Sequence, residues 1–214
     1  MRVLIVGDSI SLFRFSHSPT CSGYGQTLVA LVKKHNISFD HYGGWYLPHG
    51  QCGNTETVFN RLIQDMKTAN KYDHVYWNAG LHDVKEDHEH VDINVYASNV
   101  VKISEVFRVF YGAGVTFGST ISIAANNTRH NPIVAYNQLV RHHLPKHVSF
   151  HDQHNIITSR CGHAYITCDI HCKDGVHLSS LGDRFLGTHV FQHIMKQLEP
   201  RIRLDKDGAR MGLG

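Results

Sequence analysis

Short apolar runs alternate with amphipathic stretches along most of the chain. The runs are rich in β-branched and aromatic residues, as buried parallel strands are, and they lie near 2–7, 36–42, 72–78, 114–121 and 147–152. Between them, apolar positions at roughly helical spacing predict helices near 23–35, 54–69, 93–111 and 133–143, with a final helix at about 179–197. This alternation predicts right-handed parallel crossovers. The expected fold class is α/β: a three-layer, doubly wound, flavodoxin-like sandwich with a five-stranded parallel sheet.

A single domain accounts for this pattern. The 214 residues contain no linker-like stretch, internal repeat or low-complexity tract, and 42% of them are hydrophobic, which is enough for a sizeable core. We expect one domain over residues 1–200. Residues 201–214 follow Pro200 and show no sustained period, which predicts a loosely held C-terminal tail.

Charge and hydropathy narrow the choice of partners and location. The formal net charge of +3, from 21 Lys and Arg against 18 Asp and Glu, is small and scattered, which argues against a nucleic-acid partner. No apolar stretch approaches the roughly 18 residues that span a bilayer. The first predicted strand ends directly at the polar residues Asp8 and Ser9, and no apolar signal-peptide segment precedes it, which favours a cytoplasmic location. A leader removed before residue 1 would instead mean export. Nothing in these patterns indicates the oligomeric state.

Two short motifs at opposite ends of the chain carry the candidate chemistry. The first apolar run stops at Gly7-Asp8-Ser9, and such a serine lies at the carboxyl end of a strand, where open α/β sheets bind ligands. A serine hydroxyl needs a neighbouring base and a third group that orients the base. Asp174 and His177, three residues apart, can supply both from one loop. The chain contains no Gly-x-Ser-x-Gly, so the nucleophile elbow of the α/β-hydrolases is absent.

Two further motifs fall in order between these. Gly53-Asn54 opens a predicted helix, and Gly80-Leu81-His82-Asp83 follows the third predicted strand. Over residues 1–198 the ordered set resembles the SGNH (GDSL-type) hydrolase family, whose blocks are Gly-Asp-Ser, a lone glycine, Gly-x-Asn-Asp and Asp-x-x-His. The third block departs from the family because His82 replaces its asparagine. Similar Gly-Leu-His-Asp segments occur in relatives of the PC-esterase type.

The resemblance implies a role for each block. Ser9 is the nucleophile, His177 the base and Asp174 the residue that orients it, in a two-step acyl transfer that needs no metal or organic cofactor. The oxyanion is held by the backbone N–H groups of Ser9 and Gly53 and by the side chain of His82. Supporting roles are expected for Asp8, Asn54 and Asn78, the last being either a second donor or a brace. The mechanism predicts that activity rises with pH as the base loses its proton, at about pH 6–7 for an unperturbed imidazole.

The substrate is less visible in the sequence. The resemblance implies a serine esterase acting on short acyl esters, and we favour O-acetyl esters of carbohydrates. Two loops are expected at the mouth of the site, and they contain four ring-bearing residues: Tyr24, Trp45, Tyr46 and His49. These side chains either stack on a sugar or pack the loops. An acyltransferase with the same triad is the first alternative. The second is a non-catalytic module that binds a glycan or a protein.

Two further clusters resemble metal sites only superficially. Asp87-His88-Glu89-His90 is more typical of a solvated loop, and Cys168-x₃-Cys172 lacks the second close pair of a zinc site. No metal site is therefore expected. The cysteines stand at positions 21, 52, 161, 168 and 172. We expect reduced packing thiols, or one disulfide that braces the Asp174 loop if the protein is exported.

Overall fold

The computed structural model describes residues 1–11, 21–42, 53–65, 71–123, 129–162 and 168–211. Its centre is a five-stranded parallel sheet in the order β3-β1-β4-β5-β6. The strands are β1 (Arg2–Val6), β3 (Ser38–Tyr42), β4 (His74–Asn78), β5 (Gly114–Gly118) and β6 (Val148–His151). The predicted flavodoxin-like sheet is confirmed, with each strand inside its predicted range.

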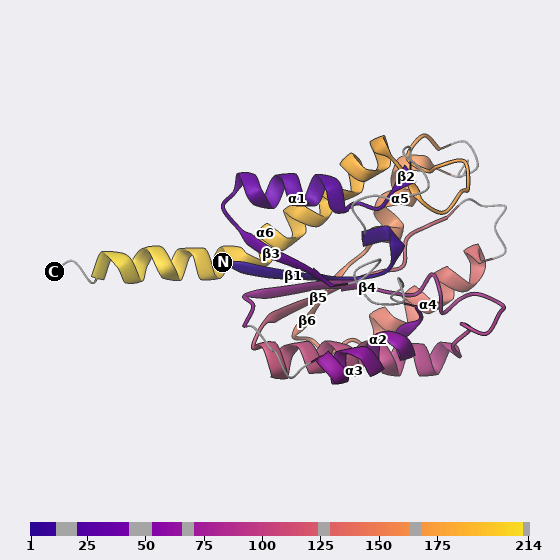
Figure 1. The fold of residues 1–214 in the computed structure, drawn as a ribbon, viewed down its shortest axis with the longest axis horizontal. Helices are drawn as coiled ribbons and strands as arrows, with labels where there is room; N and C mark the ends of the chain where they lie inside the picture. Colours follow the sequence, from indigo (N-terminus) through magenta and orange to yellow (C-terminus); the bar gives the residue numbers. More distant parts are fainter. Residues whose placement is uncertain (12–20, 43–52, 66–70, 124–128, 163–167, 212–214) are drawn as a thin grey trace.

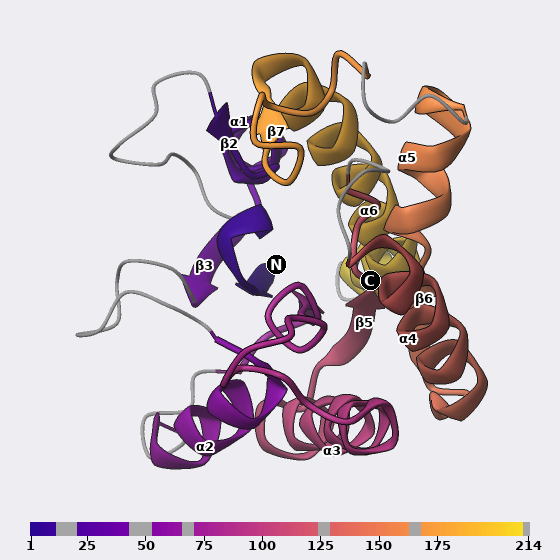
Figure 2. The ribbon, with the colours of Figure 1, turned by 90° about the vertical axis from the view of Figure 1, so that its right-hand side faces the viewer.

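Helices cover both faces of the sheet, which gives the predicted three layers (Figure 1). On one face α1 (Gly25–Lys34) packs along α6 (Ser180–Met211), and α5 (Gln153–Cys161) contacts α6. On the other face α3 (Ile93–Tyr111) packs against α2 (Thr55–Asp65) and against α4 (His130–His143). Figure 2 shows the sheet between the two layers.

The core lies against the central strands because both of their faces are covered. All five residues of β4 are buried, and so are Val3–Val6 of β1. The Trp77 ring makes edge contacts with Phe107 of α3 and Phe117 of β5. The chain passes from β1 to β3 and then across to β4, so the crossover direction reverses between β1 and β4. Open α/β sheets bind ligands at this reversal, outside the carboxyl ends of the strands.

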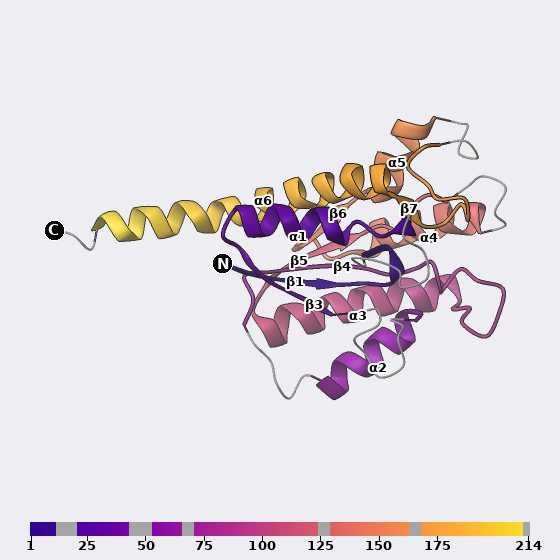
Figure 3. The ribbon, with the colours of Figure 1, turned by 45° about the horizontal axis from the view of Figure 1, so that its top comes forward.

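Two helices differ from the prediction. Helix α5 was not predicted, because its segment is largely polar and only Gln153 and Ile157 are buried in it. Helix α6 ends at Met211 rather than near Gln197 and includes Pro200. Its C-terminal part projects away from the sheet in Figures 1 and 3. Residues 201–211 are thus helical, while their loose attachment stays a prediction. In the described part of the chain, no helix is both long and apolar enough to cross a bilayer.

Candidate active site

The turn after β1 is fixed by the buried carboxylate of Asp8. Its Oδ1 accepts from the Ile10 N–H at 2.9 Å and from Asn78 Nδ2 at 3.3 Å, and its carbonyl accepts from the N–H and hydroxyl of Ser11. A side chain at Gly7 would place a Cβ 2.5 Å from Asn78 Oδ1, so β1 and β4 can approach this closely only with glycine there. These contacts hold Ser9 in the short 3₁₀ helix η1 (Ser9–Ser11), at the carboxyl edge of the sheet.

The base comes from the loop before α6. His177 Nε2 lies 3.2 Å from Ser9 Oγ, and His177 Nδ1 lies 2.6 Å from Asp174 Oδ2. The other carboxylate oxygen of Asp174 accepts from the N–H groups of Val176 and His177, each at 2.9 Å. Burial raises the pKa of Asp174, but the hydrogen bonds from the His177 ring and these two N–H groups more than offset it, and the pKa is lowered. Asp174 is therefore ionised at neutral pH and accepts a proton-bearing Nδ1.

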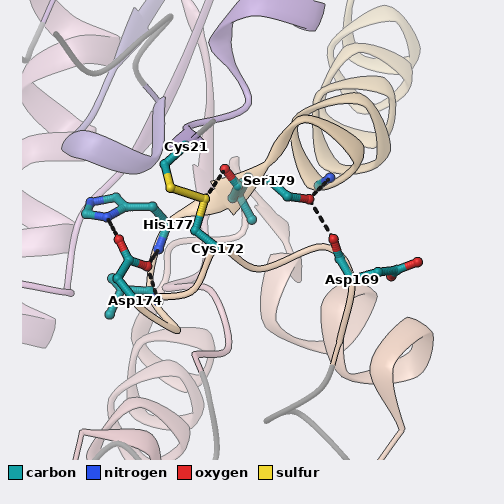
Figure 4. The surroundings of a disulfide bond; sticks show 9 residues. Cys21, Asp169, Cys172, Asp174, His177 and Ser179 are labelled. Atoms are coloured by element: carbon teal, nitrogen blue, oxygen red, sulfur yellow. Dashed lines mark hydrogen bonds and ion pairs between the residues drawn. A yellow bond between two sulfur atoms is a disulfide. The ribbon is translucent and has the colours of Figure 1, made fainter. Parts of the chain in front are cut away.

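The loop that carries this pair is tied to the nucleophile side of the fold. A disulfide joins Cys21 to Cys172, and β2 (Cys21–Ser22) pairs antiparallel with β7 (Leu178–Ser179). Within the loop, the Cys172 N–H donates to the His177 carbonyl at 2.8 Å. Figure 4 shows the disulfide directly beside Asp174 and His177. The His177 loop is thus attached at both of its ends.

Gly80 shapes the turn that presents the third block. Its φ is +132°, and a Cβ there would lie 1.9 Å from Thr120 Oγ1, so only glycine fits this position. The turn continues with the Val84 N–H donating to the Gly80 carbonyl. His82 follows, with Nδ1 3.0 Å from Glu89 Oε1, and Glu89 also forms an ion pair with Lys85.

The second block is joined to the third by Asp83, whose side chain is fully buried. Its Oδ1 accepts from the Thr55 N–H at 2.9 Å and from the Thr55 hydroxyl at 2.6 Å, at the start of α2. Asn54 caps the same helix by accepting from the Thr57 N–H, and its Nδ2 donates to the Glu89 carbonyl. Burial raises the pKa of Asp83 to about 6. Gly53 therefore stands where the second and third blocks meet.

Asp8 lies within the electrostatic reach of both histidines. Burial raises its pKa, and the electrostatic interactions with His82 and His177 and the hydrogen bonds from Ile10 and Asn78 only partly offset this. The structure thus gathers Ser9, Asp174 and His177 into one hydrogen-bonded chain and places His82 near the nucleophile turn. Their catalytic roles stay predictions.

Two expectations need qualification. Asn78 accepts from the Tyr24 hydroxyl at 2.7 Å and donates to Asp8, which makes it a brace of the nucleophile turn. Tyr24 is completely buried, so it packs the core and does not face a sugar. Trp45, Tyr46, His49 and Cys52 lie outside the described residues.

The cysteines correct a further expectation. Cys21–Cys172 is the bracing disulfide that the sequence left open, and Cys161–Cys168 forms a second one. Of the two alternatives, reduced thiols are wrong for these four residues. The Cys21–Cys172 bond has no local sequence signal, because its cysteines are separated by 151 in the sequence. Within the described ranges, no three His, Cys, Asp or Glu side chains are arranged to hold a metal ion.

Glu89 is the site residue that sequence reasoning placed incorrectly, because it was considered only within the metal-like cluster. It follows His82 by seven residues in an irregular loop, so no helical or strand spacing links the two.

Comparison with solved structures supports the fold. No family model and no curated protein matches the chain. Among solved structures, the acetylxylan esterase Axe2 from Geobacillus stearothermophilus superposes with a TM-score of 0.68 at 16% identity, over 92% of this chain and 93% of Axe2. The chain shares its fold with this esterase. The acetyl xylan esterase AlAXEase also gives 0.68 at 16% identity, over 91% of this chain and all of that protein.

A lipolytic protein of the G-D-S-L family from Veillonella parvula gives the same TM-score at 16% identity, over 89% of this chain and 96% of that protein. The matches include a catalytic mutant of Axe2 in which a serine is replaced by alanine. At these identities the comparisons show a common fold.

Proposed function

We propose that the protein is a serine ester hydrolase of the SGNH type, with Ser9 as nucleophile, His177 as base and Asp174 as the residue that orients it. The observation that carries this proposal is the chain of contacts from Ser9 Oγ to His177 Nε2 and from His177 Nδ1 to the ionised Asp174. The carboxylate keeps the proton on Nδ1, so Nε2 carries the lone pair that accepts the serine proton. A hydroxyl activated in this way attacks an ester carbonyl.

The catalytic cycle then needs only groups of this chain. His177 takes the proton as Ser9 Oγ bonds to the carbonyl carbon, and it returns that proton to the departing alcohol. Water, deprotonated by His177, cleaves the acyl-enzyme and restores Ser9. The N–H groups of Ser9 and Gly53, together with His82, are the proposed oxyanion donors; loss of one such donor typically costs about 10²–10³ in rate. With Gly-Leu-His-Asp in place of the family segment, the third block is of the PC-esterase type.

O-acetyl esters of carbohydrates are the proposed substrates. The support is that Axe2 and AlAXEase, which share this fold over nearly the whole chain, are acetylxylan esterases. Fold alone does not determine a substrate, so the acyl length and the alcohol have to be measured directly.

The test is hydrolysis of p-nitrophenyl acetate, p-nitrophenyl octanoate and acetylated xylan by the parent protein, Ser9→Ala and His177→Ala. We expect the parent to favour acetate and each variant to lose roughly a thousandfold or more in kcat/KM. Ser98→Ala and His88→Ala are the matched controls, since Ser98 is exposed on α3 and His88 lies on an exposed loop. A rate shared by all five proteins would contradict the proposal and favour a non-catalytic module. Acyl transfer to added xylose would assign a transferase instead.

A further inference from the structure

Ser11 holds the turn that carries the nucleophile. Its N–H and its hydroxyl both donate to the Asp8 carbonyl, at 3.1 and 2.9 Å. The Ser11 side chain is completely buried, and a Cβ on Gly7 would lie 2.7 Å from its Oγ, so the hydroxyl occupies space that only a glycine at position 7 leaves open. A carbonyl oxygen has two lone pairs, and these two donors occupy both.

The Asp8 carbonyl belongs to the same peptide group as the Ser9 N–H. A peptide group is planar and almost always trans, so its C=O and its N–H point in opposite directions. Fixing the carbonyl therefore fixes the direction of the Ser9 N–H, which is one of the three proposed oxyanion donors. Such a donor contributes most when it is oriented before the charge develops.

His41 reaches Ser11 from the neighbouring strand. In the parallel register of β1 and β3 it stands opposite Ile5, near the carboxyl ends of both strands. Its Nε2 lies 3.1 Å from Ser11 Oγ, and its ring also forms a hydrogen bond with the Ser11 backbone. His41 thus links the end of β3 to the turn after β1.

The direction of the contact between His41 and Ser11 follows from the other bonds of Ser11. A carbonyl can only accept, so the single hydroxyl proton of Ser11 is used in the contact with Asp8. The contact with His41 therefore uses a proton on Nε2, and the Ser11 oxygen accepts it. Burial lowers the pKa of His41 to about 4, and the hydrogen bond with the Ser11 backbone opposes this only in part. The ring is therefore neutral at pH 7 and carries one N–H.

We propose that His41 is a positioning residue for the ester hydrolase: its Nε2–H holds the Ser11 hydroxyl, the hydroxyl holds the Asp8 carbonyl, and the carbonyl directs the Ser9 N–H at the oxyanion. This inference rests on the proposed esterase function. In this role His41 contacts neither the ester nor Ser9 Oγ, and no proton moves along the chain of hydrogen bonds during the reaction.

The surroundings of this contact are apolar. A small cavity of about 10 Å³ lies beside Ser11 and His41. The rest of its lining comes from β1, β3 and α1, namely Ile5, Gly25, Leu28, Val29, Val32 and Phe39. The apolar side chains of this lining offer no hydrogen-bond donor. Removing the His41 N–H therefore leaves the Ser11 oxygen without a donor on that side, and the hydroxyl loses the group that holds it.

The test compares two replacements of His41. His41→Met fills the space without a donor, whereas the side-chain amide of His41→Gln can place an N–H near the position of Nε2. For p-nitrophenyl acetate we expect kcat and kcat/KM to fall together, by about tenfold to a hundredfold, in His41→Met and in Ser11→Ala. Loss of a whole oxyanion donor costs about 10²–10³ in rate, and a misdirected donor retains part of its effect. His41→Gln should recover most of the rate.

Two comparisons separate this role from ordinary packing. His74→Met removes a similar buried contact, between His74 Nε2 and Thr116 Oγ1 at 2.9 Å, at the amino end of β4. It should lower the free energy of unfolding in urea and leave kcat unchanged. In Ser11→Ala/His41→Met the loss of rate should be no larger than in Ser11→Ala alone, because the two residues act in series. An unchanged kcat in His41→Met, or losses that multiply in the double variant, would overturn the inference.

A readout that does not depend on turnover separates the two proposals. In ¹H–¹⁵N NMR spectra the Ser9 amide resonance should shift in Ser11→Ala and His41→Met, and it should stay in place in His41→Gln and His74→Met. If the parent protein hydrolyses no ester while this pattern is present, the proposed function fails and the coupling of His41 to the Ser9 N–H stands. If hydrolysis is normal while the Ser9 resonance does not respond to His41→Met, the inference fails alone.

Discussion

The disulfide between Cys21 and Cys172 offers the sharpest test of how the fold holds its base. It closes a segment with a sequence separation of 151, whereas Cys161 and Cys168 are separated by 7. In the chain-entropy description, these loops correspond to stabilisation of about 5 and about 2 kcal/mol. Replacing Cys21 and Cys172 with serine should therefore lower the free energy of unfolding by more than replacing Cys161 and Cys168 with serine.

The two bonds also differ in their relation to the site. Cys172 lies two residues before Asp174, and its N–H donates to the His177 carbonyl. Loosening this loop shifts His177 Nε2 relative to Ser9 Oγ, and misplacement by about 1 Å costs about a hundredfold in rate. We expect Cys21→Ser/Cys172→Ser to lose about tenfold to a hundredfold in kcat/KM, and Cys161→Ser/Cys168→Ser to lose little.

Urea unfolding followed by circular dichroism, with kcat/KM measured below the transition, gives both quantities. Every variant should carry Cys52→Ser, so that no remaining thiol exchanges with a disulfide. Equal loss of stability in the two double variants would refute the loop-length argument. Full activity without Cys21–Cys172 would show that the β2–β7 pairing alone holds the base.

Three further changes test other parts of the argument. Asp174→Asn should lower kcat by about 10⁴-fold, because the amide no longer keeps the proton on Nδ1; steady-state assays that show less than a tenfold loss would contradict this. Gly80→Ala should destabilise the protein by at least about 3 kcal/mol, since the added Cβ would meet Thr120. Gly112→Ala is the comparison, because Gly112 has φ +63° but nothing lies within 4 Å of an added Cβ, and it should cost about 1–2 kcal/mol. Urea unfolding measures both. Burial, with the nearby His193 and His189, lowers the pKa of His151 to about 3. Below pH 6.5 the unfolded chain therefore binds a proton at His151 that the folded chain does not. The free energy of unfolding falls as pH drops from about 6.5 towards 3, by about 1.4 kcal/mol per pH unit for this residue. In His151→Asn the free energy of unfolding should depend less steeply on pH, and an equal dependence would contradict the assignment.

The central strands β1 and β4 could be predicted because each is a largely apolar run whose residues are almost all buried. Trp77 and Val75 of β4, for example, are fully buried, so every position of the run is under the same constraint. Helix α5 gave no such signal, since it lies at the margin with few buried residues. Residues 201–211 of α6 lack a sustained apolar period, so their helical conformation was not visible in the sequence.

The site shows the same division between local and long-range information. Ser9, Asp174 and His177 could be named because each lies in a short motif whose chemistry is local. The pairing of Cys21 with Cys172 and the contact of His82 with Glu89 depend on how loops meet in space, which residue spacing does not encode. For Tyr24 the sequence left two roles open, and its burial and its hydrogen bond to Asn78 support packing.

The nucleophile and its base are 168 residues apart in the chain. Ser9 is synthesised 168 residues before His177, so on the proposed mechanism a nascent chain carries an inert serine over that whole interval. The proposed activity begins only when the loop of Asp174 and His177 docks beside β1, which would make ester hydrolysis a direct reporter of that long-range contact.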